Sequence, residues 1–234
     1  MNVFTLNARA GIVAVVVGIL LLFFGGPMDQ GPLFVAAIFS FLVLSTIVTS
    51  IGVAYKKKIR VYELVRGVSN VLSNSAGPLL FAFTYWIGHI YASEQLAGLS
   101  MIGFMASVAA ITADKFGSEI GVLGKAPVMI FTFKKVKKGV SGGVSLLGLV
   151  SGLVAAVIIS AWSAVLVPTI YGLGFQVGVL GLMGIISLGG FAGTVVDSMV
   201  GYFETKGMGT KATTNVFCGV VGGLVGFLLL ALVG

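Results

Sequence analysis

Charged residues, histidine and cysteine are all scarce in this chain of 234 residues. Charged side chains make up only 9% of it against 58% hydrophobic residues, and the mean hydropathy is +1.13. A soluble protein of this size could not hide so much apolar surface, because its exterior needs charge to stay dispersed. A soluble enzyme, a secreted disulfide scaffold and a disordered chain are therefore excluded, and the composition indicates an integral membrane protein.

The single cysteine and the single histidine limit the chemistry further. Cys218 alone excludes an internal disulfide and a cysteine metal cluster. A metal site built from histidines is equally unexpected, because His89 has no second histidine to join it. We interpret His89, which lies near Tyr85, Trp86 and Tyr91, as part of an interfacial belt, and Cys218 as a small packing residue.

Long apolar runs, in contrast, are abundant. A helix needs about 20 residues to cross a bilayer, and the candidate runs lie at about 9–25, 32–54, 68–92, 96–113, 142–166, 173–200 and 214–233. Glycine, at 35 residues, recurs four residues apart within these runs, which favours close helix packing. The sequence therefore predicts one polytopic membrane domain over residues 1–234. Its expected class is all-α, a glycine-rich, close-packed bundle of about seven transmembrane helices.

The basic residues indicate how the bundle is oriented. All 14 of them fall on one side of the apolar runs, at Arg9 and in residues 55–67, 114–141 and 201–213. The positive-inside rule assigns that side, and with it the N-terminus, to the cytoplasm. We interpret the formal charge of +7 as cytoplasmic anchoring and affinity for an anionic ligand rather than for nucleic acid. With no Arg- and Ser-rich leader visible, the expected location is a prokaryotic cell (cytoplasmic) membrane.

A polar stripe leads into the third apolar run. Glu63, Arg66, Asn70 and Asn74 are three and four residues apart, so they would share one helix face. The two asparagines could hold a base, a ribose or a phosphate, or they could bond across to another helix. Asn215 adds a further amide near the start of the last run, on the same side.

Three carboxylates lie at the predicted cytoplasmic ends of helices. Asp114 and Glu119 follow the fourth run, and Asp197 ends the sixth. Such carboxylates suit Mg²⁺, a hard cation that prefers oxygen ligands. Asp114 and Glu119 are about 140° apart on a regular helix, so they can share one site only if the helix breaks at the nearby glycines. The alternative is that the carboxylates pair with neighbouring lysines.

A run of lysines followed by glycines and serines precedes the fifth apolar run. Its members are Lys134, Lys135, Lys137, Lys138, Gly139, Ser141, Gly142, Gly143 and Ser145. Glycine lets backbone N–H groups converge, and a helix N-terminus attracts anions, so this segment is a candidate phosphate cradle. It is not a Walker A motif, because no Gly-Lys-Ser/Thr follows the loop. The lysines alone could instead anchor the topology or contact lipid headgroups.

Three stretches together resemble a known family. They are Ala-Asp-x-x-x-Ser-Glu-Ile-Gly at 113–121, Lys-Lys-Val-x-x-Gly-x-Ser-Gly-Gly-Val-Ser-Leu-Leu-Gly at 134–148, and Asp-Ser-x-x-Gly at 197–201. The resemblance is to the integral membrane family that includes plant chloroplast phytyl-phosphate kinase, which is more distantly similar to dolichol kinase and CDP-diacylglycerol synthase. Two positions depart from the expected pattern, since Lys115 and Val140 stand where threonine is expected; donor preference or substrate could therefore differ.

The resemblance implies a polyprenyl-phosphate kinase of lipid metabolism. It would transfer a phosphoryl group from a nucleoside triphosphate, CTP by expectation, to an isoprenyl or phytyl monophosphate at the cytoplasmic membrane face. Asp114, Glu119 and Asp197 are the expected Mg²⁺ ligands, and with Lys138 they form the expected catalytic set. The expected nucleotide- and phosphate-binding residues are Asn70, Asn74, Lys134, Lys135, Lys137, Gly139, Ser141, Gly142, Gly143, Ser145, Ser198 and Asn215. No nucleic-acid partner is expected, and a homodimer stays open.

Two other functions stay open at this point. A cytidylyltransferase that makes a CDP-lipid would need the same Mg²⁺, CTP and lipid phosphate, with attack at the α-phosphorus instead of the γ-phosphorus. A transporter or flippase of an anionic lipid or phosphate compound is a function of another class. Transporters place their binding groups near the bilayer midplane, whereas the charges here gather at one face, which disfavours transport.

Overall fold

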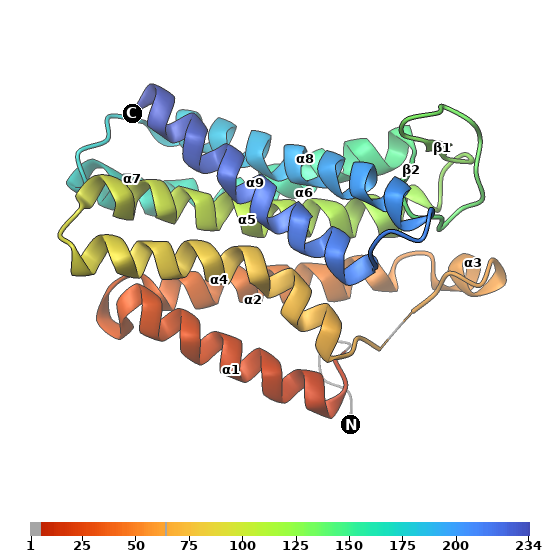
Figure 1. The fold of residues 1–234 in the computed structure, drawn as a ribbon, viewed down its shortest axis with the longest axis horizontal. Coiled ribbons are helices and arrows are strands. Elements are labelled where there is room, and N and C mark those ends of the chain that lie inside the picture. Colours follow the sequence, from red (N-terminus) through yellow and green to blue (C-terminus); the bar gives the residue numbers. More distant parts are fainter. Residues whose placement is uncertain (1–5, 64) are drawn as a thin grey trace.

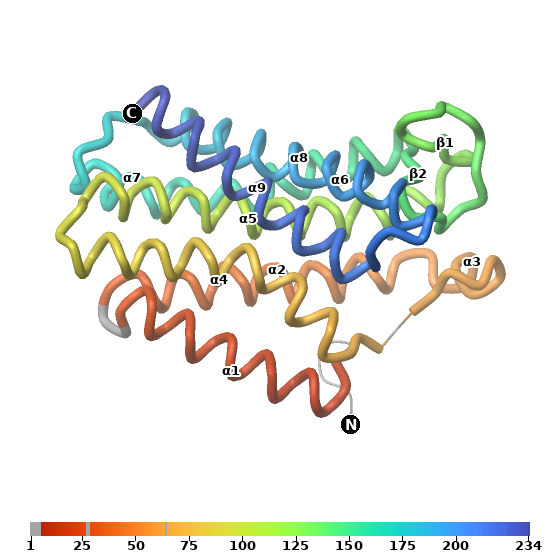
Figure 2. The backbone as a smooth tube through the Cα atoms, viewed as in Figure 1, coloured from red at the N-terminus to blue at the C-terminus, as the bar shows by residue number. Residues whose placement is uncertain are grey.

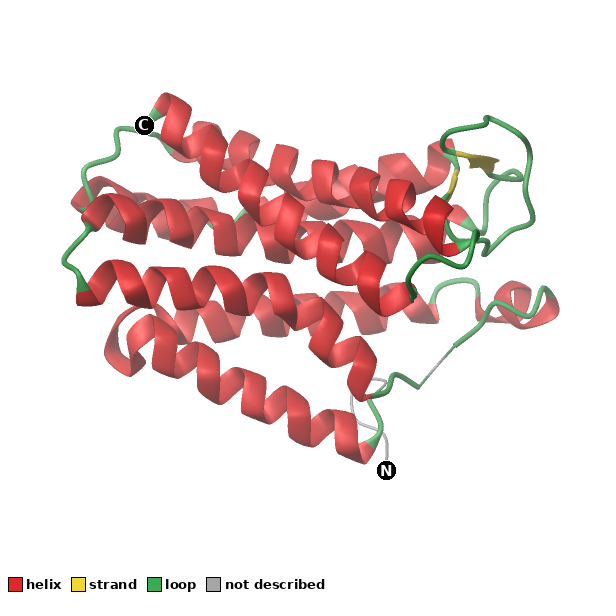
Figure 3. Ribbon diagram, viewed as in Figure 1, coloured by secondary structure: helices red, strands yellow, loops and turns green. Residues whose placement is uncertain are grey.

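The structure of the protein is a computed structural model that describes residues 6–63 and 65–234. It is a bundle of long helices that run along a shared direction, with short strands confined to one end (Figures 1 and 3). The longer helices are α1 (Ala8–Gly25), α2 (Gly31–Ser50), α4 (Val68–Ile90), α5 (Glu94–Gly121), α6 (Leu146–Ser160), α7 (Ser163–Gly172), α8 (Val179–Glu204) and α9 (Lys211–Val233). The shorter elements are the π-helical turn η1 (Gly26–Gln30), α3 (Val53–Lys58) and the antiparallel strands β1 (Val128–Met129) and β2 (Gly143–Val144).

These elements confirm the predicted all-α membrane bundle. Within the described ranges, α1, α2, α5, α8 and α9 are each long and apolar enough to span a membrane. The helices α6 and α7 together make a sixth candidate, bent by 53° at the break between them. With its 23 residues α4 is long enough to be the seventh, but it buries polar side chains such as Ser73 and Asn74, which lower its hydropathy. Each predicted run thus contains one long helix, but the run at 142–166 ends inside α7, so the segment between that run and the next is also helical.

The central element of the bundle is α5. Its residues 97–113 are all buried, and α4, α6, α8 and α9 pack around it (Figure 2). Glycines allow this closeness, because a Cβ added to Gly222 of α9 would lie 2.4 Å from the Cβ of Ala110. A Cβ added to Gly193 of α8 would lie 2.5 Å from the same atom. The glycine-rich close packing expected from the sequence is thus present between α5, α8 and α9.

The helices α1 and α2 form an outer pair that packs on α4 and α5 (Figure 1). Large apolar side chains such as Ile12, Ile19 and Phe23 are exposed on α1, as expected for a surface that faces lipid. At the turn between the pair, Asp29 accepts a hydrogen bond of 2.8 Å from the Tyr85 hydroxyl. Burial alone would raise the pKa of the Asp29 carboxyl, but hydrogen bonds from His89, Tyr85 and a neighbouring glutamine hold it below its usual value.

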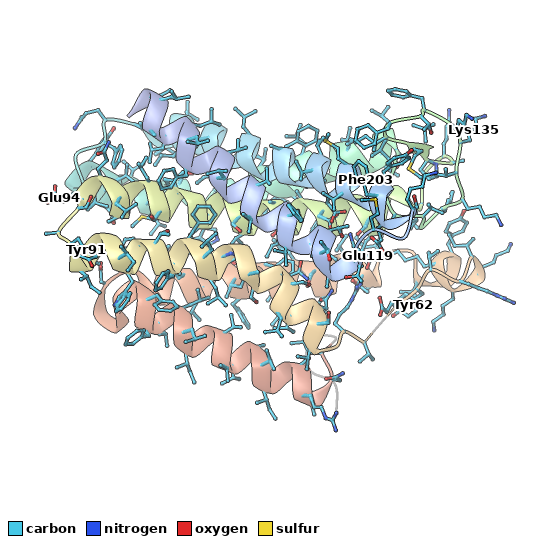
Figure 4. The ribbon with its side chains drawn as sticks, in the orientation of Figure 1. Tyr62, Tyr91, Glu94, Glu119, Lys135 and Phe203 are labelled. Atoms are coloured by element: carbon cyan, nitrogen blue, oxygen red, sulfur yellow. The ribbon has the colours of Figure 1, made fainter. Side chains whose placement is uncertain are left out.

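The basic segments of the chain gather at one end of the bundle. This end carries α3, the β1–β2 segment and the α8–α9 turn, and we call it the basic end. Lys135 and Tyr62 lie there, whereas Tyr91 and Glu94 mark the opposite end (Figure 4). The basic loops therefore share one side, as the sequence indicates, while its assignment to the cytoplasm stays a prediction.

Several helix limits differ from the predicted runs. α5 continues to Gly121 instead of ending near residue 113, and α8 continues to Glu204 instead of residue 200. Polar residues in these extensions find partners at the basic end, since Glu119 of α5 pairs with Lys56 and Arg66 and Glu204 of α8 accepts a hydrogen bond from Ser141. α2 ends earlier than predicted, at Ser50, because Gly52 takes a left-handed φ of 68°. α6 begins at Leu146 rather than at residue 142.

Candidate functional site

The turn before α6 is shaped by two glycines. Gly139 and Gly142 have φ values of 83° and 75°, a region that favours glycine. A Cβ added to Gly142 would lie 2.6 Å from the backbone nitrogen of Tyr202 in α8. The turn is therefore pressed against the end of α8, and no side chain fits between them.

Two serines of the same turn tie it to the neighbouring helices. The Ser141 hydroxyl donates to Oε2 of Glu204 at 2.7 Å, which links the turn to α8. The Ser145 hydroxyl donates to the carbonyl of Gly121 at 3.3 Å, which links it to α5. Ser145 also caps α6, since its Oγ accepts from the backbone N–H of Gly148 at 3.1 Å. The turn is thus held in place from three sides.

Two carboxylates from different helices meet one lysine next to this turn. Lys211, the first residue of α9, places its Nζ 3.0 and 2.9 Å from the two carboxylate oxygens of Asp197 in α8. The same Nζ lies 3.9 Å from Oδ2 of Asp114 in α5. The Asp197 side chain is only 8% exposed. The structure therefore brings Asp114 and Asp197 together, as predicted, around a lysine that the predicted site did not include.

The carboxylates and the turn line one cavity of about 310 Å³ at the basic end. We call it the polar cavity. Residues of the predicted site that line it are Asp114, Gly139, Ser141, Gly142, Gly143, Ser145, Asp197 and Ser198. Lys211 and Glu204 also line it. A glycine-rich turn beside an acidic pair and a lysine is a suitable environment for a polyphosphate that carries a metal ion.

A second cavity of about 220 Å³ lies between α1, α2 and α4. We call it the apolar cavity, because aliphatic and aromatic side chains such as Val17, Ile38 and Leu42 form most of its wall. Its inner end is polar and is lined by Arg66, Asn70, Asn74, Lys115 and Asn215. Asp114, Ser118 and Lys211 line both cavities, so the two cavities meet at these residues.

The predicted asparagines all lie at the apolar cavity and not at the polar one. The Asn74 amide donates to the backbone carbonyl of Asn70 at 2.7 Å, within α4. The Asn215 amide donates across to the Ser73 hydroxyl at 3.4 Å and so joins α9 to α4. Oδ1 of Asn215 is buried without a hydrogen-bond partner among the residues that the structure describes. The Asn215 amide thus bonds across to another helix, as one interpretation of the sequence expects, while ligand binding by the three amides stays a prediction.

The structure does not bring Glu119 to the other two carboxylates. α5 is continuous through Gly121, so Asp114 and Glu119 stay about 140° apart on the helix. Oε2 of Glu119 accepts from Lys56 at 2.6 Å, and Oε1 accepts from Arg66 at 3.1 Å and from Lys115. Across residues 6–63 and 65–234, no three acidic, histidine or cysteine side chains form a group suited to a metal. The expectation of a three-carboxylate cluster therefore needs correction to a pair.

The lysines of the predicted cradle lie outside both cavity linings. Lys134, Lys135 and Lys137 are exposed on the loop that precedes the turn. The Lys138 ammonium donates to the Tyr55 hydroxyl at 2.8 Å and lies 4.9 Å from the centre of that ring. The structure therefore does not bring Lys138 to the carboxylates. The cations at the site are instead Lys211, Lys115 and Arg66, which come from three other segments.

The family described as "Integral membrane protein DUF92" matches residues 2–221. The uncharacterized membrane protein MJ0933 of Methanocaldococcus jannaschii is 32% identical over 216 residues, which cover 92% of this chain and 81% of that protein. No solved structure matches the chain.

Two proteins of Arabidopsis thaliana are similar over shorter stretches. Protein VTE6, which is chloroplastic, is 34% identical over 139 residues, or 55% of this chain and 38% of that protein. Protein PGR is 30% identical over 184 residues, or 71% of this chain and 62% of that protein. The chain thus spans less than two thirds of the length of either plant relative.

Proposed function

The chain belongs to the integral membrane protein family DUF92, and on this premise we propose that it is a polyprenyl-phosphate kinase. The reaction transfers the γ-phosphoryl group of a nucleoside triphosphate, with CTP as the preferred donor, to an isoprenyl or phytyl monophosphate. The product is the isoprenyl diphosphate. Two independent lines support the proposal: the motifs that resemble the phytyl-phosphate kinase family, and the arrangement of the two cavities.

The observation that carries the proposal is that the polar and apolar cavities share Asp114, Ser118 and Lys211. A kinase with a lipid acceptor must bring a water-soluble nucleotide and an apolar chain to one point. The polar cavity offers a glycine-rich turn for phosphates, and the apolar cavity offers space between helices for a chain. Their meeting point contains charged groups of both signs, which phosphoryl transfer requires for positioning and charge neutralisation.

The residues present fit the Mg²⁺ that the proposal requires. Asp114 and Asp197 come from neighbouring helices and already share one cationic partner, Lys211. Mg²⁺ at nucleotide sites is commonly held by one or two carboxylates together with substrate phosphates, so a third carboxylate is not needed. Asp114 and Asp197 would hold the ion. When bound, it would neutralise part of the charge of the nucleotide phosphates.

The protein groups around the junction suit the remaining requirements of the reaction. An oxygen of the acceptor phosphate forms a bond to the γ-phosphorus, and the bond from that phosphorus to the β–γ bridging oxygen breaks, which releases the nucleoside diphosphate. The acceptor is already an anion, so no residue has to remove a proton from it. Lys211, Lys115 and Arg66 are positioned to offset the negative charge of donor and acceptor. The proposed face is cytoplasmic, which the positive-inside rule supports.

The proposal is tested with the purified protein in detergent, Mg²⁺, γ-labelled CTP and a panel of isoprenyl monophosphates. Label in an isoprenyl diphosphate, with CDP released, is the expected result. Label in pyrophosphate, with a CDP-lipid formed, would replace the kinase by a cytidylyltransferase. The assay is repeated with ATP, GTP and UTP. If the protein bound the isoprenyl monophosphates but no nucleoside triphosphate changed them, transport of an anionic lipid would become the leading function.

A further inference from the structure

We infer that the apolar cavity between α1, α2 and α4 binds the lipid acceptor, with the isoprenoid chain between the helices and the phosphate at Arg66 and Lys115. The identity of the ligand as an isoprenyl monophosphate rests on the proposed function. The broader class of an anionic amphiphile is indicated by the cavity itself, which joins an apolar wall to a cationic end.

The apolar wall is suited to part of a chain. Val17 of α1 is buried, Ile38 of α2 is half-buried, and Phe39 is 49% exposed on the outer side. The volume of about 220 Å³ is below the range of about 300–1,000 Å³ typical of ligand pockets. The cavity therefore fits the part of the chain nearest the phosphate, and the remainder would pass between α1 and α2 into the bilayer.

Three cations near the polar end of the cavity gather around one mostly buried carboxylate, while Glu63, which also contacts Arg66 at 3.4 Å, is 69% exposed and offsets little of their charge. Lys56, Arg66 and Lys115 all pair with the single carboxylate of Glu119. Their side chains are only 1%, 19% and 14% exposed, respectively. Buried charges are unfavourable unless they are balanced, so this cluster favours a further anion. A phosphate monoester supplies one, and it suits the fork of donors on an arginine.

The position of Arg66 is fixed by the backbone before the first helix. Asn7 donates its backbone N–H to the carbonyl of Arg66 at 3.2 Å, and Leu6 forms a bridge with Arg66. Leu6 and Arg66 both line the apolar cavity. These contacts tie the backbone of Arg66 to the segment before α1, at the polar end of the cavity.

Asn215 supplies a second, independent observation. This residue of α9 is 4% exposed and lines the cavity, and its Oδ1 has no hydrogen-bond partner among the described residues. Unpartnered buried polar atoms are rare in native proteins and call for a partner. A protonated phosphate oxygen or a water bound with the phosphate would donate to it. The phosphate so placed lies beside Asp114 and Lys211, where the polar cavity begins.

The glycines of α1 provide a clean test. A Cβ added to Gly18 would meet no atom within 4 Å, and Gly18 lines the cavity. Gly11 has the same free space on the same helix, but it does not line the cavity. Gly18→Leu therefore fills the cavity without a backbone clash, and Gly11→Leu is its matched control. Ala14→Leu, at another lining position, is a second filling variant should Gly18→Leu not fold.

Binding is measured without nucleotide, by photo-crosslinking the detergent-solubilised protein with a diazirine-tagged farnesyl monophosphate and mapping the labelled peptides. We expect label in α1, α2 and α4, competed by phytyl monophosphate but by neither inorganic phosphate nor phytol alone. Gly18→Leu should weaken binding by about tenfold or more, which corresponds to about 1.4 kcal/mol, whereas Gly11→Leu should match the wild type. Competition by inorganic phosphate alone would show an ion site and would overturn the lipid assignment.

A variant of the cationic end tests the position of the phosphate. Arg66→Gln should weaken binding of farnesyl monophosphate, while Arg9→Gln, at an exposed arginine of α1, should leave that binding unchanged. Label in the cavity without phosphoryl transfer from any nucleotide would keep this inference and reject the kinase. The opposite outcome has two parts: Gly18→Leu and Ala14→Leu leave phosphoryl transfer unchanged, and the label lies outside α1, α2 and α4. That outcome would keep the kinase and reject this inference.

Discussion

The ammonium of Lys211 lies 2.9 Å from Oδ2 of Asp197, and this ion pair joins the start of α9 to the part of α8 at the basic end of the bundle. The same ammonium lies 3.9 Å from Oδ2 of Asp114, so it would compete with a metal ion for both carboxylates of the polar cavity. In the proposed reaction Lys211 would offset part of the carboxylate charge before substrate binds, and it would be available to the phosphates afterwards.

The first prediction concerns the carboxylate of Asp197. Asp197→Asn should reduce phosphoryl transfer on the order of 100-fold or more, because a neutral amide is a poor Mg²⁺ ligand. The measurement is transfer of label from γ-labelled CTP to an isoprenyl monophosphate. Asp29→Asn, at the opposite end of the bundle, is the control and should keep full activity. Full activity of Asp197→Asn in well-folded protein would contradict the metal assignment.

The second prediction concerns Lys211 itself. Lys211→Met should tighten Mg²⁺ binding in the absence of nucleotide, because the ammonium no longer competes for the carboxylates. It should also lower phosphoryl transfer by at least about tenfold, because a cation is lost from the junction. The first effect is measured as the Mg²⁺ dependence of the thermal unfolding midpoint. Lys206→Met, in the α8–α9 turn, is the control. The ammonium of Lys206 lies 5.7 Å from the centre of the Tyr202 ring instead of pairing with Asp114 or Asp197.

The third prediction concerns the turn at Gly142. Gly142→Ala should destabilise the protein and raise the KM for nucleotide, because φ is positive there and the added Cβ would overlap Tyr202. Gly207→Ala is a matched control, since Gly207 also has a positive φ, 82°, but has no atom within 4 Å of an added Cβ. Backbone strain of about 1–3 kcal/mol is common to both variants. Equal loss of stability and equal KM values would show that the turn is not pressed against α8.

The fourth prediction concerns the carboxylate that three cations share. Glu119→Gln should lower stability by about 3–5 kcal/mol, because Lys56 is left buried without its anion. Farnesyl monophosphate should then raise the unfolding midpoint more in this variant than in the wild type, because its phosphate replaces the lost charge. Glu63→Gln is the control: Glu63 contacts Arg66 at 3.4 Å but is 69% exposed, so its loss should have little effect. A midpoint in Glu119→Gln that farnesyl monophosphate does not move would contradict the anion site.

The sequence predicts the helices well and their ends less well. Apolar runs identify the spans because each must cover about 20 residues of bilayer. The extension of α5 to Gly121 is different, because it depends on Lys56 and Arg66, which reach Glu119 from distant segments. Composition along one run contains no information about such partners, so the apolar run ends where the charges begin although the helix continues.

The candidate site shows the same division. Gly139 and Gly142 could be recognised because a turn with positive φ leaves a mark on the sequence, namely glycine itself. Pairing of Asp197 with a neighbouring lysine is an alternative that the sequence leaves open, and the Lys211 contact confirms it. The approach of the same lysine to Asp114 could not be recognised, because it depends on how the α8–α9 turn directs the first residue of α9. The lysines of residues 134–138 gave the opposite error. Their charge is conspicuous in the sequence, but the fold leaves them on a loop outside the cavities.

The burial of α5 also bears on how the protein responds to its membrane. Residues 97–113 of this helix are buried within the protein, and close glycine contacts pack α8 and α9 against it. A bilayer that is thicker or thinner than the spans is accommodated by tilting helices that do face lipid, here chiefly the outer pair α1 and α2. Residues of α1 and α2 line the apolar cavity, so its width would change with their tilt. The positions of Asp114 and Asp197 relative to each other would not change, because α5 and α8 stay packed together. We therefore expect acyl-chain length of the host lipid to change KM for the acceptor while leaving KM for the nucleotide constant, in a series of reconstituted bilayers.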